Sequence, residues 1–276
     1  MRIASRHTLA PLFLLLASSA AQAQRSSDYD DRDWERNCRD GWGGSDDRGR
    51  ACQVRPVAVR LSGRAISIDG RENGSIRVIG WDGDSVKLSA RIQANARDDA
   101  AAKELIDNVK ITVDGSRISS DVQRGWSRNE NVSVSYVLFV PRRFDLDLDA
   151  NNGSLGVNGV SGKMDLRTTN GSVSLTDVGG DVHAHTQNGS LNLQLAGGKW
   201  DGRGLDADTQ NGSVRMGIPS SYAATIETET VNGHVNTDFP VTVQGRISRH
   251  LTLPLNGGGT TLRATTVNGS VTLSRR

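Results

Sequence analysis

The sequence predicts an all-β protein, a parallel β-helix (β-solenoid) with coils of about 18 residues and one short helix inserted near its N-terminal end. Three observations predict this fold. An Asn-Gly-Ser tripeptide recurs, alternating apolar residues follow it, and a threonine stands two places before the asparagine in most repeats. The repeated dipeptides are Asn152-Gly153, Asn170-Gly171, Asn188-Gly189, Asn211-Gly212, Asn232-Gly233 and Asn268-Gly269, with Asn73-Gly74 as an earlier outlier.

The spacing of the asparagines indicates stacking. From Asn152 onward they are separated by 18, 18, 23, 21 and 36 residues, and 36 is twice 18. The third residue after the asparagine is apolar in each unit, as in Leu155, Val173 and Leu191, and polar and apolar residues then alternate. Such alternation is typical of a half-buried strand. In stacked coils like residues lie over like residues, so we expect one buried apolar column and a ladder of asparagines.

The Asn-Gly dipeptides also admit a second interpretation. Asn-Gly is the strongest short-range signal for a hairpin, so an antiparallel sandwich or barrel remains the alternative. Hairpins, however, would place turns of varied chemistry every 8–12 residues or so. In either fold we expect the glycine to supply a positive φ at a sharp corner.

The register extends one coil towards the N-terminus. Residues 144–149 alternate between apolar and acidic, and similar apolar residues follow at 18-residue intervals. Two inward columns are therefore expected, one of Leu146, Met164 and Val182 and one of Leu148, Leu166 and Ala184. The matching outward columns are Asp145, Lys163 and Asp181; Asp147, Asp165 and His183; and Asp149, Arg167 and His185.

Five strands and one helix are expected before the repeats. The helix covers about residues 100–109, with Asp98 or Asp99 as its N-cap and an apolar stripe that includes Leu105 and Ile106. The strands are expected at residues 65–69, 75–79, 85–92, 110–113 and 132–140.

The first 23 residues have the features of a secretory signal peptide. Arg2 and Arg6 precede an apolar stretch from Leu9 to Ala17, and Ala21-Gln22-Ala23 resembles a cleavage site. The apolar stretch is too short to span a bilayer as a helix. We therefore expect an exported protein, periplasmic or extracellular, without a transmembrane segment.

Residues 24–55 form a polar segment rich in Asp, Arg, Gly and Trp, expected to be poorly packed. It contains Cys38 and Cys52, which we expect to form a disulfide in an oxidising compartment. Two free thiols or a zinc site are the alternatives, although neither a histidine nor a second cysteine pair stands nearby. Strands are expected from Pro56 onward, so the predicted domain covers residues 56–276.

Charge and aromatic content argue against nucleic-acid binding. The whole chain carries a net charge of +2, and loss of Arg2 and Arg6 leaves 31 basic against 31 acidic residues. Nucleic-acid binding domains instead need a clustered basic face. Aromatic residues make up only 4% of the chain, too few to suggest base-stacking platforms.

Several motifs in order resemble a known bacterial family. Ile79-Gly80-Trp81-Asp82 follows the early Asn-Gly-Ser, and Val140-Pro141-Arg142-Arg143 leads into the repeats. With the helix and the Thr-x-Asn-Gly-Ser coils, this order over residues 56–276 resembles the exported bacterial "putative adhesin" family. The resemblance implies a parallel β-helix in the cell envelope and a non-enzymatic adhesion or scaffold role.

The outward columns are the candidate site for any chemistry. Asp147, Asp165, His183 and His185 would lie side by side, where histidines and carboxylates can bind a metal or paired carboxylates can hydrolyse glycosides. Interleaved Lys163 and Arg167 instead indicate a solvated, mixed-charge face. We therefore expect no catalytic residues, metal or cofactor, and an envelope polysaccharide or surface protein as partner. A carbohydrate-active enzyme and an envelope accessory or stress protein are the alternatives.

Overall fold

The computed structural model describes residues 31–40, 49–61, 63–71, 73–122, 130–240 and 249–276. The expected signal peptide lies outside these residues. Among the helices that the structure describes, none is both long and apolar enough to cross a bilayer.

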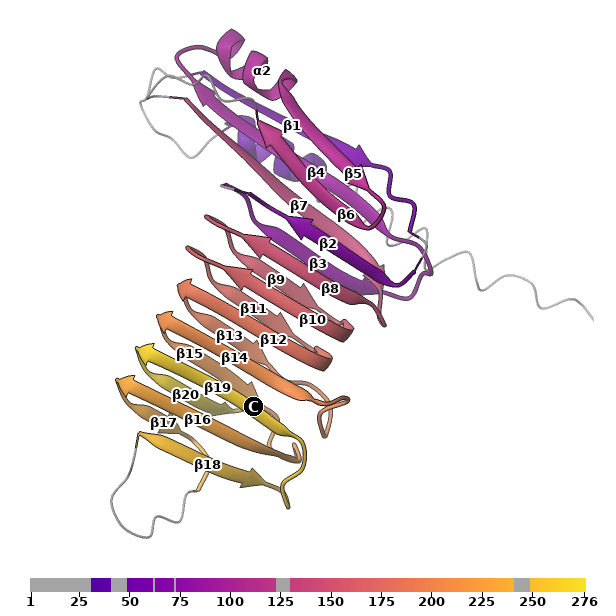
Figure 1. Cartoon of the computed structure of the whole chain (residues 1–276). Helices are drawn as coiled ribbons and strands as arrows, with labels where there is room; N and C mark the ends of the chain where they lie inside the picture. The colour runs from indigo at the N-terminus through magenta and orange to yellow at the C-terminus, as the bar shows by residue number, and fades with distance from the viewer. Residues whose placement is uncertain (1–30, 41–48, 62, 72, 123–129, 241–248) are drawn as a thin grey trace, which may run out of the picture.

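Two ten-stranded sheets face each other across one hydrophobic core (Figure 1). Sheet A contains, in order across the sheet, β1 (Gly49–Val57), β4 (Lys87–Ala96), β7 (Asn131–Pro141), β3 (Ile76–Trp81), β9 (Leu155–Asn158), β11 (Val173–Thr176), β13 (Leu191–Gln194), β15 (Val214–Ile218), β20 (Val271–Arg275) and β17 (Val235–Thr237). Sheet B contains β18 (His250–Leu255), β16 (Ala224–Asn232), β19 (Thr261–Asn268), β14 (Gly204–Asn211), β12 (Gly179–Asn188), β10 (Ser161–Thr168), β8 (Asp145–Ala150), β2 (Ala65–Asp69), β6 (Arg117–Val122) and β5 (Val109–Asp114).

Each coil consists of one strand of sheet B, an Asn-Gly corner and one strand of sheet A, and successive coils pair in parallel. Leu146 pairs with Met164 and Met164 with Val182, as the 18-residue register predicts. On the other sheet Leu155, Val173 and Leu191 form one column, each at most 1% exposed. The predicted register of these coils is confirmed, and consecutive coils do not pair as antiparallel hairpins.

The two sheets are nevertheless mixed, so the prediction of a purely parallel β-helix is not confirmed. At the N-terminal end of the stack, β4 pairs antiparallel with both β1 and β7, and β5 pairs antiparallel with β6. At the other end β18 pairs antiparallel with β16. Antiparallel strands thus cover the coils at the N-terminal end and the sheet B edge at the other end, where unpaired backbone groups could otherwise recruit other chains. Among the described strands β17 remains the edge of sheet A. The fold is all-β and solenoid-like.

The coils are not stacked in chain order. The last coil, β19 and β20, lies between the coil of β14 and β15 and the coil of β16 and β17 (Figure 1). The 36-residue interval before Asn268 therefore holds no further parallel coil among the described residues; it contains the antiparallel strand β18.

Helix α2 (Asp99–Asp107) packs its small apolar face against the N-terminal strands of sheet A. Its N-cap is Asp98, whose carboxylate accepts a hydrogen bond of 2.7 Å from the backbone N–H of Ala101. Ala102 and Ile106 are buried. At the other end the Arg55 guanidinium donates to the carbonyls of Ile106 and Val109, both at 2.7 Å, and so satisfies groups that a helix C-terminus leaves open.

A second helix over residues 31–40 contradicts the prediction of a single helix and of a poorly packed segment there. The Cys38–Cys52 disulfide ties it to β1, which runs from Gly49 across the expected boundary at residue 55. Asp31 pairs with the buried Arg91 of β4 at 2.8 Å, and that guanidinium lies 5.6 Å from the centre of the Trp34 ring. Composition does not show these contacts, because their partner lies some 60 residues away.

The Thr-x-Asn-Gly-Ser corner is explained by contacts between neighbouring coils. The asparagines form one ladder in which each side-chain amide donates to the Oδ1 of the next, for example Asn170 to Asn152 at 2.8 Å. The buried threonine hydroxyl donates to a glycine carbonyl of the adjacent coil, as Thr186 does to Gly171 at 2.7 Å. The ladder runs through Asn73, Asn152, Asn170, Asn188, Asn211, Asn268 and Asn232, in the order of stacking.

Five of the seven corner glycines do not serve the predicted purpose. Only Gly74 and Gly269 have a positive φ, which is 157° in both. The other five, Gly153, Gly171, Gly189, Gly212 and Gly233, are not among the positive-φ residues. A Cβ on Gly171 would lie 2.1 Å from the carbonyl oxygen of Gly153, and each of the other four meets a glycine carbonyl of its neighbouring coil in the same way. Glycine is required there by close approach between stacked backbones.

Candidate functional site

The outer face of sheet B carries most of the charge of the coils. Its outward side chains on β8, β10, β12, β14, β19 and β16 include nine carboxylates, three cations and two histidines; we call this surface the acidic face. The carboxylates are Asp145, Asp147, Asp149, Asp165, Asp181, Asp206, Asp208, Glu227 and Glu229, and the cations are Lys163, Arg167 and Arg263. The outer face of sheet A over the same coils has Arg215 as its one charged side chain on the strands from β9 to β17, apart from Arg275 at the end of β20.

The residues predicted to share this face do lie in adjacent rows. Asp147 lies opposite Asp165 on the neighbouring strand, and Asp165 lies opposite His183 on the strand after that. His185 lies in the next row. Asp147 accepts from the Ser67 hydroxyl at 3.0 Å. The Arg167 guanidinium pairs with Asp165 and also lies 4.0 Å from Asp147, whereas His183 Nε2 lies 3.5 Å from Asp181.

The two histidines therefore face other carboxylates rather than Asp147 and Asp165, which share Arg167. His185 faces the next coil, where its Nδ1 lies 2.6 Å from Asp208 Oδ2. Within the described residues, no group of three or more His, Cys, Asp or Glu side chains is arranged to hold a metal ion. The face carries a series of ion pairs, some of which share a partner.

Asp149 is the carboxylate on this face whose ionisation is disfavoured. Partial burial raises its pKa most, and the nearby Asp69 carboxylate raises it further, whereas Arg167 acts in the opposite direction. Because the folded-state pKa lies above the unfolded value, ionising Asp149 favours the unfolded chain. This loss of stability develops as pH rises from the unfolded pKa through the folded pKa.

Replacing Asp149 by Asn is therefore expected to raise the melting temperature at pH 7. The gain should correspond to at most about 0.5 kcal/mol, since the side chain is exposed. At about pH 3, where an aspartate is protonated in both states, the variant and the wild-type protein should melt together. Melting curves across this pH range provide the measurement, and a gain that persists at the acid end would contradict an electrostatic origin.

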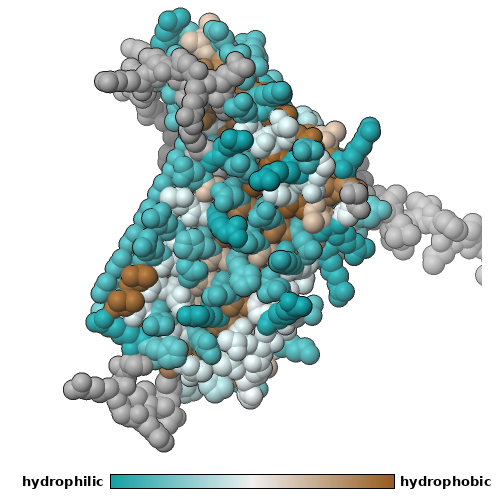
Figure 2. Space-filling model, viewed as in Figure 1, coloured by the Kyte–Doolittle hydropathy of each residue, from teal (hydrophilic) through white to brown (hydrophobic). Residues whose placement is uncertain are grey.

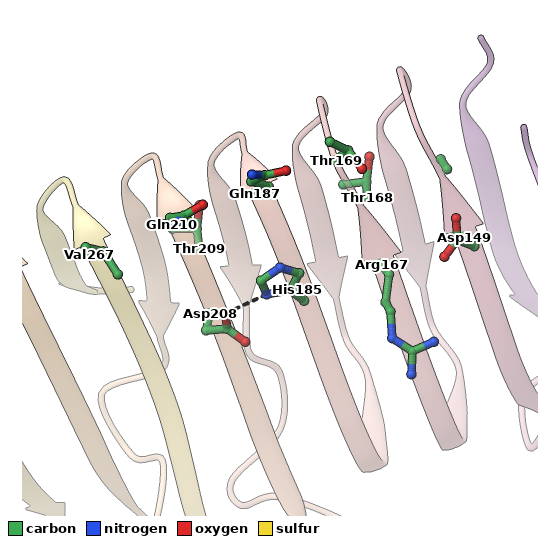
Figure 3. A pocket seen from close by; sticks show the side chains of 11 residues that line it. Asp149, Arg167, Thr168, Thr169, His185, Gln187, Asp208, Thr209, Gln210 and Val267 are labelled. Carbon is green, nitrogen blue, oxygen red and sulfur yellow. Dashed lines mark hydrogen bonds and ion pairs between the residues drawn. The ribbon is translucent and has the colours of Figure 1, made fainter. Parts of the chain in front are cut away.

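A groove runs along the acidic face beside the Asn-Gly corners, with a volume of about 510 Å³ (Figure 3). One wall consists of Asp149, Arg167, His185 and Asp208, and the other of Thr169, Gln187, Gln210 and Val267. The two rows cross five neighbouring coils, from β8 to β19. With strands about 4.8 Å apart, the groove is roughly 20 Å long.

The groove offers hydrogen bonds rather than apolar contact. Its floor includes the buried Thr168 and Thr209, whose hydroxyls donate to corner glycine carbonyls. No Trp, Tyr or Phe lines it. At its C-terminal end the polar row gives way to Val267 and the neighbouring Val231, which are 40% and 49% exposed. Figure 2 shows a small apolar spot at the edge of an otherwise hydrophilic face of the coils.

A second hollow of about 530 Å³ lies at the N-terminal end of the coils. It is lined by apolar Val59, Leu61 and Phe144 together with Asp82. The Arg142 guanidinium, 2.6 Å from Asp82, holds the pKa of that carboxyl below its usual range. Sequence repeats do not extend to this hollow, and it crosses no series of coils.

The groove was missed by the sequence prediction, which followed the outward rows only as far as His185. The missing wall is the residue between Thr and Asn in each Thr-x-Asn-Gly repeat. Its members Thr169, Gln187 and Gln210 are one outward step further along the same strands. The same alternation that predicted Asp149, Arg167 and His185 could have located them.

Comparison with known proteins identifies the family. A model of the family described as Toastrack DUF4097 matches residues 53–274. The chain belongs to the Toastrack DUF4097 family. The family resemblance of the sequence motifs is thereby confirmed. Solved structures similar to this Toastrack chain carry the descriptions "putative cell adhesion protein" and "putative adhesin".

Three similar solved structures show how low the sequence identity to this chain is. A "putative cell adhesion protein" from Clostridium sporogenes is 12% identical, covering 82% of this chain and 100% of its own, with a TM-score of 0.40. A "putative adhesin" from Bacteroides fragilis is 12% identical, with coverage of 82% and 97% and a TM-score of 0.38. A "putative lipid binding protein" from Parabacteroides distasonis is 10% identical, with coverage of 82% and 96% and a TM-score of 0.33. At these scores the Toastrack assignment rests on the family match, and the search of curated proteins found no match.

Proposed function

We propose that this Toastrack protein is an exported, non-enzymatic binding module of the bacterial cell envelope, acting in adhesion or as a scaffold, and that the groove binds an extended envelope polysaccharide. The observation that carries the proposal is the groove itself, in which polar side chains repeat coil after coil over four coils, before Val267 of the fifth coil ends the row. A repeating row of amides, hydroxyls and carboxylates matches a repeating polymer rich in hydroxyl groups better than it matches a small molecule, which proteins usually enclose in a mostly apolar pocket.

Export is supported by two independent features. The Cys38–Cys52 disulfide belongs to the bonds that persist in oxidising compartments. Residues 1–23 have the charged start, apolar stretch and small-residue cleavage site of a signal peptide. The protein would then act in the periplasm or outside the cell.

A binding role without catalysis is supported by the ion pairs of the acidic face. Catalytic acids and bases are usually found in concave, partly desolvated sites with shifted pKa values. Asp165 is instead paired with Arg167, and His185 with Asp208, on an exposed surface. The rival activity, cleavage of a polysaccharide by the Asp147, Asp165 and His183 row, would need these pairs to break.

The test is a glycan array, followed by calorimetry with any polysaccharide that binds, using the chain from Gln24 onward. Gln187→Ala combined with Gln210→Ala should weaken binding about tenfold or more, because two amides are removed from one wall. Ser174→Ala combined with Asn192→Ala, on the outer face of sheet A, is the matched control and should leave affinity unchanged. Both double variants should keep the wild-type melting temperature.

Three results would count against the proposal. Silence on the array, or equal loss of affinity in both double variants, would remove the groove as the binding site. Release of new reducing ends from a bound polysaccharide, abolished by Asp165→Asn with His183→Asn, would instead establish an enzyme.

A further inference from the structure

The C-terminal coil occupies a slot between two coils that precede it in the chain. β19 pairs in parallel with β14 on one side and with β16 on the other, and β20 does the same with β15 and β17. Within the described strands, β16 and β17 have no ladder to β14 and β15. The coil of residues 224–237 is therefore joined to the rest of the stack through the C-terminal coil.

Charge explains why this slot exists. With the Thr and Asn corners aligned, direct stacking of β16 on β14 would set Glu227 opposite Asp206 and Glu229 opposite Asp208. Like charges directly opposite on neighbouring strands are destabilising. The inserted strand places Arg263 between Asp206 and Glu227, and Thr265 between Asp208 and Glu229. The acidic strands β14 and β16 thus flank the slot, and β19, the strand that fills it, carries the cation Arg263.

The C-terminal coil is connected to the preceding strand, β18, by a short linker that contains three glycines. Residues Asn256, Gly257, Gly258 and Gly259 all have positive φ, with values of 46°, 91°, 80° and 144°. Five residues, 256–260, separate β18 from β19. Fully extended, they would reach about 17 Å, and a chain with three consecutive glycines can adopt many conformations.

The C-terminal coil makes hydrogen bonds to the coils on both sides of it. Asn268 donates to Asn211 and accepts from Asn232, both at 2.8 Å, and the Thr266 hydroxyl donates to the Gly212 carbonyl at 2.7 Å. An identical coil from another molecule would make every one of these bonds. Exchange would therefore preserve the ladders and change only the path of the linker.

We propose that residues 261–276 are an exchangeable coil, and that the slot between the coils 204–218 and 224–237 accepts this coil from a second copy of the chain. The closed monomer and the exchanged dimer contain the same inter-coil contacts. The balance between them is set by protein concentration while the slot is open during folding. The exchanged dimer would present two grooves on one assembly.

A cysteine pair across the slot distinguishes the two forms. Arg215 on β15 and Thr272 on β20 are partners in neighbouring parallel strands on the outer face of sheet A. Strand neighbours are about 4.8 Å apart, within the range of Cα separations that disulfides span. Oxidation of an Arg215→Cys, Thr272→Cys variant joins the coils within one chain in the monomer and between chains in the exchanged dimer.

The chain from Gln24 onward should be unfolded without reductant at about pH 5, where thiols exchange slowly, and refolded at about 1 µM and about 100 µM before oxidation. We expect monomer on a non-reducing gel after dilute refolding, and a covalent dimer after concentrated refolding. The control pair Ser174→Cys with Asn192→Cys joins β11 to β13, on the same side of the linker, and should give monomer in both cases. No dimer at any concentration, a non-covalent dimer, or a control that also cross-links chains would overturn the proposal.

The stabilising effect of Arg263 between the two acidic strands can be measured separately. Arg263→Glu should lower the melting temperature more than Arg215→Glu, because Arg263, unlike Arg215, lies between two acidic partners, Asp206 and Glu227. The neighbours of Arg215 are Asn192 and Thr272. Equal melting temperatures for the two variants would show that charge does not keep the slot open.

Discussion

Replacing Val173 by Asp is expected to unfold the solenoid or bring it close to unfolding. Val173 is fully buried in β11, stacked between Leu155 and Leu191, and the neighbouring inward side chains are apolar. A buried, unpaired carboxylate shifts its pKa upwards by as much as 3–5 units, which corresponds to roughly 4–7 kcal/mol at neutral pH. Domains of ordinary stability have an unfolding free energy of about 5–15 kcal/mol, so this single change removes a large share of that free energy.

The sign of the pH dependence makes the test specific. The folded-state pKa of the introduced carboxyl would lie above its unfolded value, so the variant should lose stability relative to wild type as pH rises and recover part of it in acid. Ser174→Asp, one residue further along the same strand and exposed, should stay within about 0.5 kcal/mol. Chemical denaturation followed by circular dichroism measures both variants. Wild-type stability in Val173→Asp would contradict the stacked register.

The coil register could be predicted because two constraints in the sequence agree. Alternation places Leu146 and Leu148 on one face, and the repeated Asn-Gly dipeptide fixes their alignment with Met164 and Leu166. A shift by one residue would expose every apolar side chain of a strand, so alternation excludes that register.

The stacking order could not be predicted from the repeats, since each coil has the same Thr-x-Asn-Gly corner and fits any neighbour equally well. What distinguishes the coils is the outward row, where Glu227 and Glu229 would meet Asp206 and Asp208. That information is present in the sequence, but it decides between topologies only when the alternatives are compared strand by strand. The helix over residues 31–40 was missed for a related reason, because its ion pair with Arg91 is remote in sequence.

The candidate site was predicted in part. Alternation brings Asp147, Asp165 and His183 into one row, as expected. Which carboxylate each histidine faces depends on side-chain rotamers: His183 turns to Asp181 on its own strand, whereas His185 turns to Asp208 on the next coil. These rotamers determine whether the side chains form a chain of ion pairs or converge on one site. The spacing of residues in the sequence does not predict them.

Replacing Gly171 by Ala is expected to destabilise the protein by about 2–4 kcal/mol, near the upper end of what overpacking a tight contact costs. The added Cβ would lie 2.1 Å from the carbonyl oxygen of Gly153 in the next coil, so a backbone must move. That same oxygen accepts the hydrogen bond of Thr168 at 2.8 Å, which the movement would weaken. The opposing effect, a less flexible unfolded chain, stabilises by only about 0.4–1 kcal/mol.

The matched control is Gly156→Ala, the same chemical change on the outward face of β9, where a Cβ meets no atom within 4 Å. That variant should be neutral or slightly more stable, since alanine restricts the unfolded chain.

Gly171→Asn separates the two explanations for the corner glycine. Asparagine tolerates positive φ, so it would rescue a conformational requirement, but it carries the same Cβ and cannot relieve a close approach. Denaturation midpoints should therefore group Gly171→Asn with Gly171→Ala. An asparagine variant as stable as wild type would restore positive φ as the reason that glycine occupies the corner.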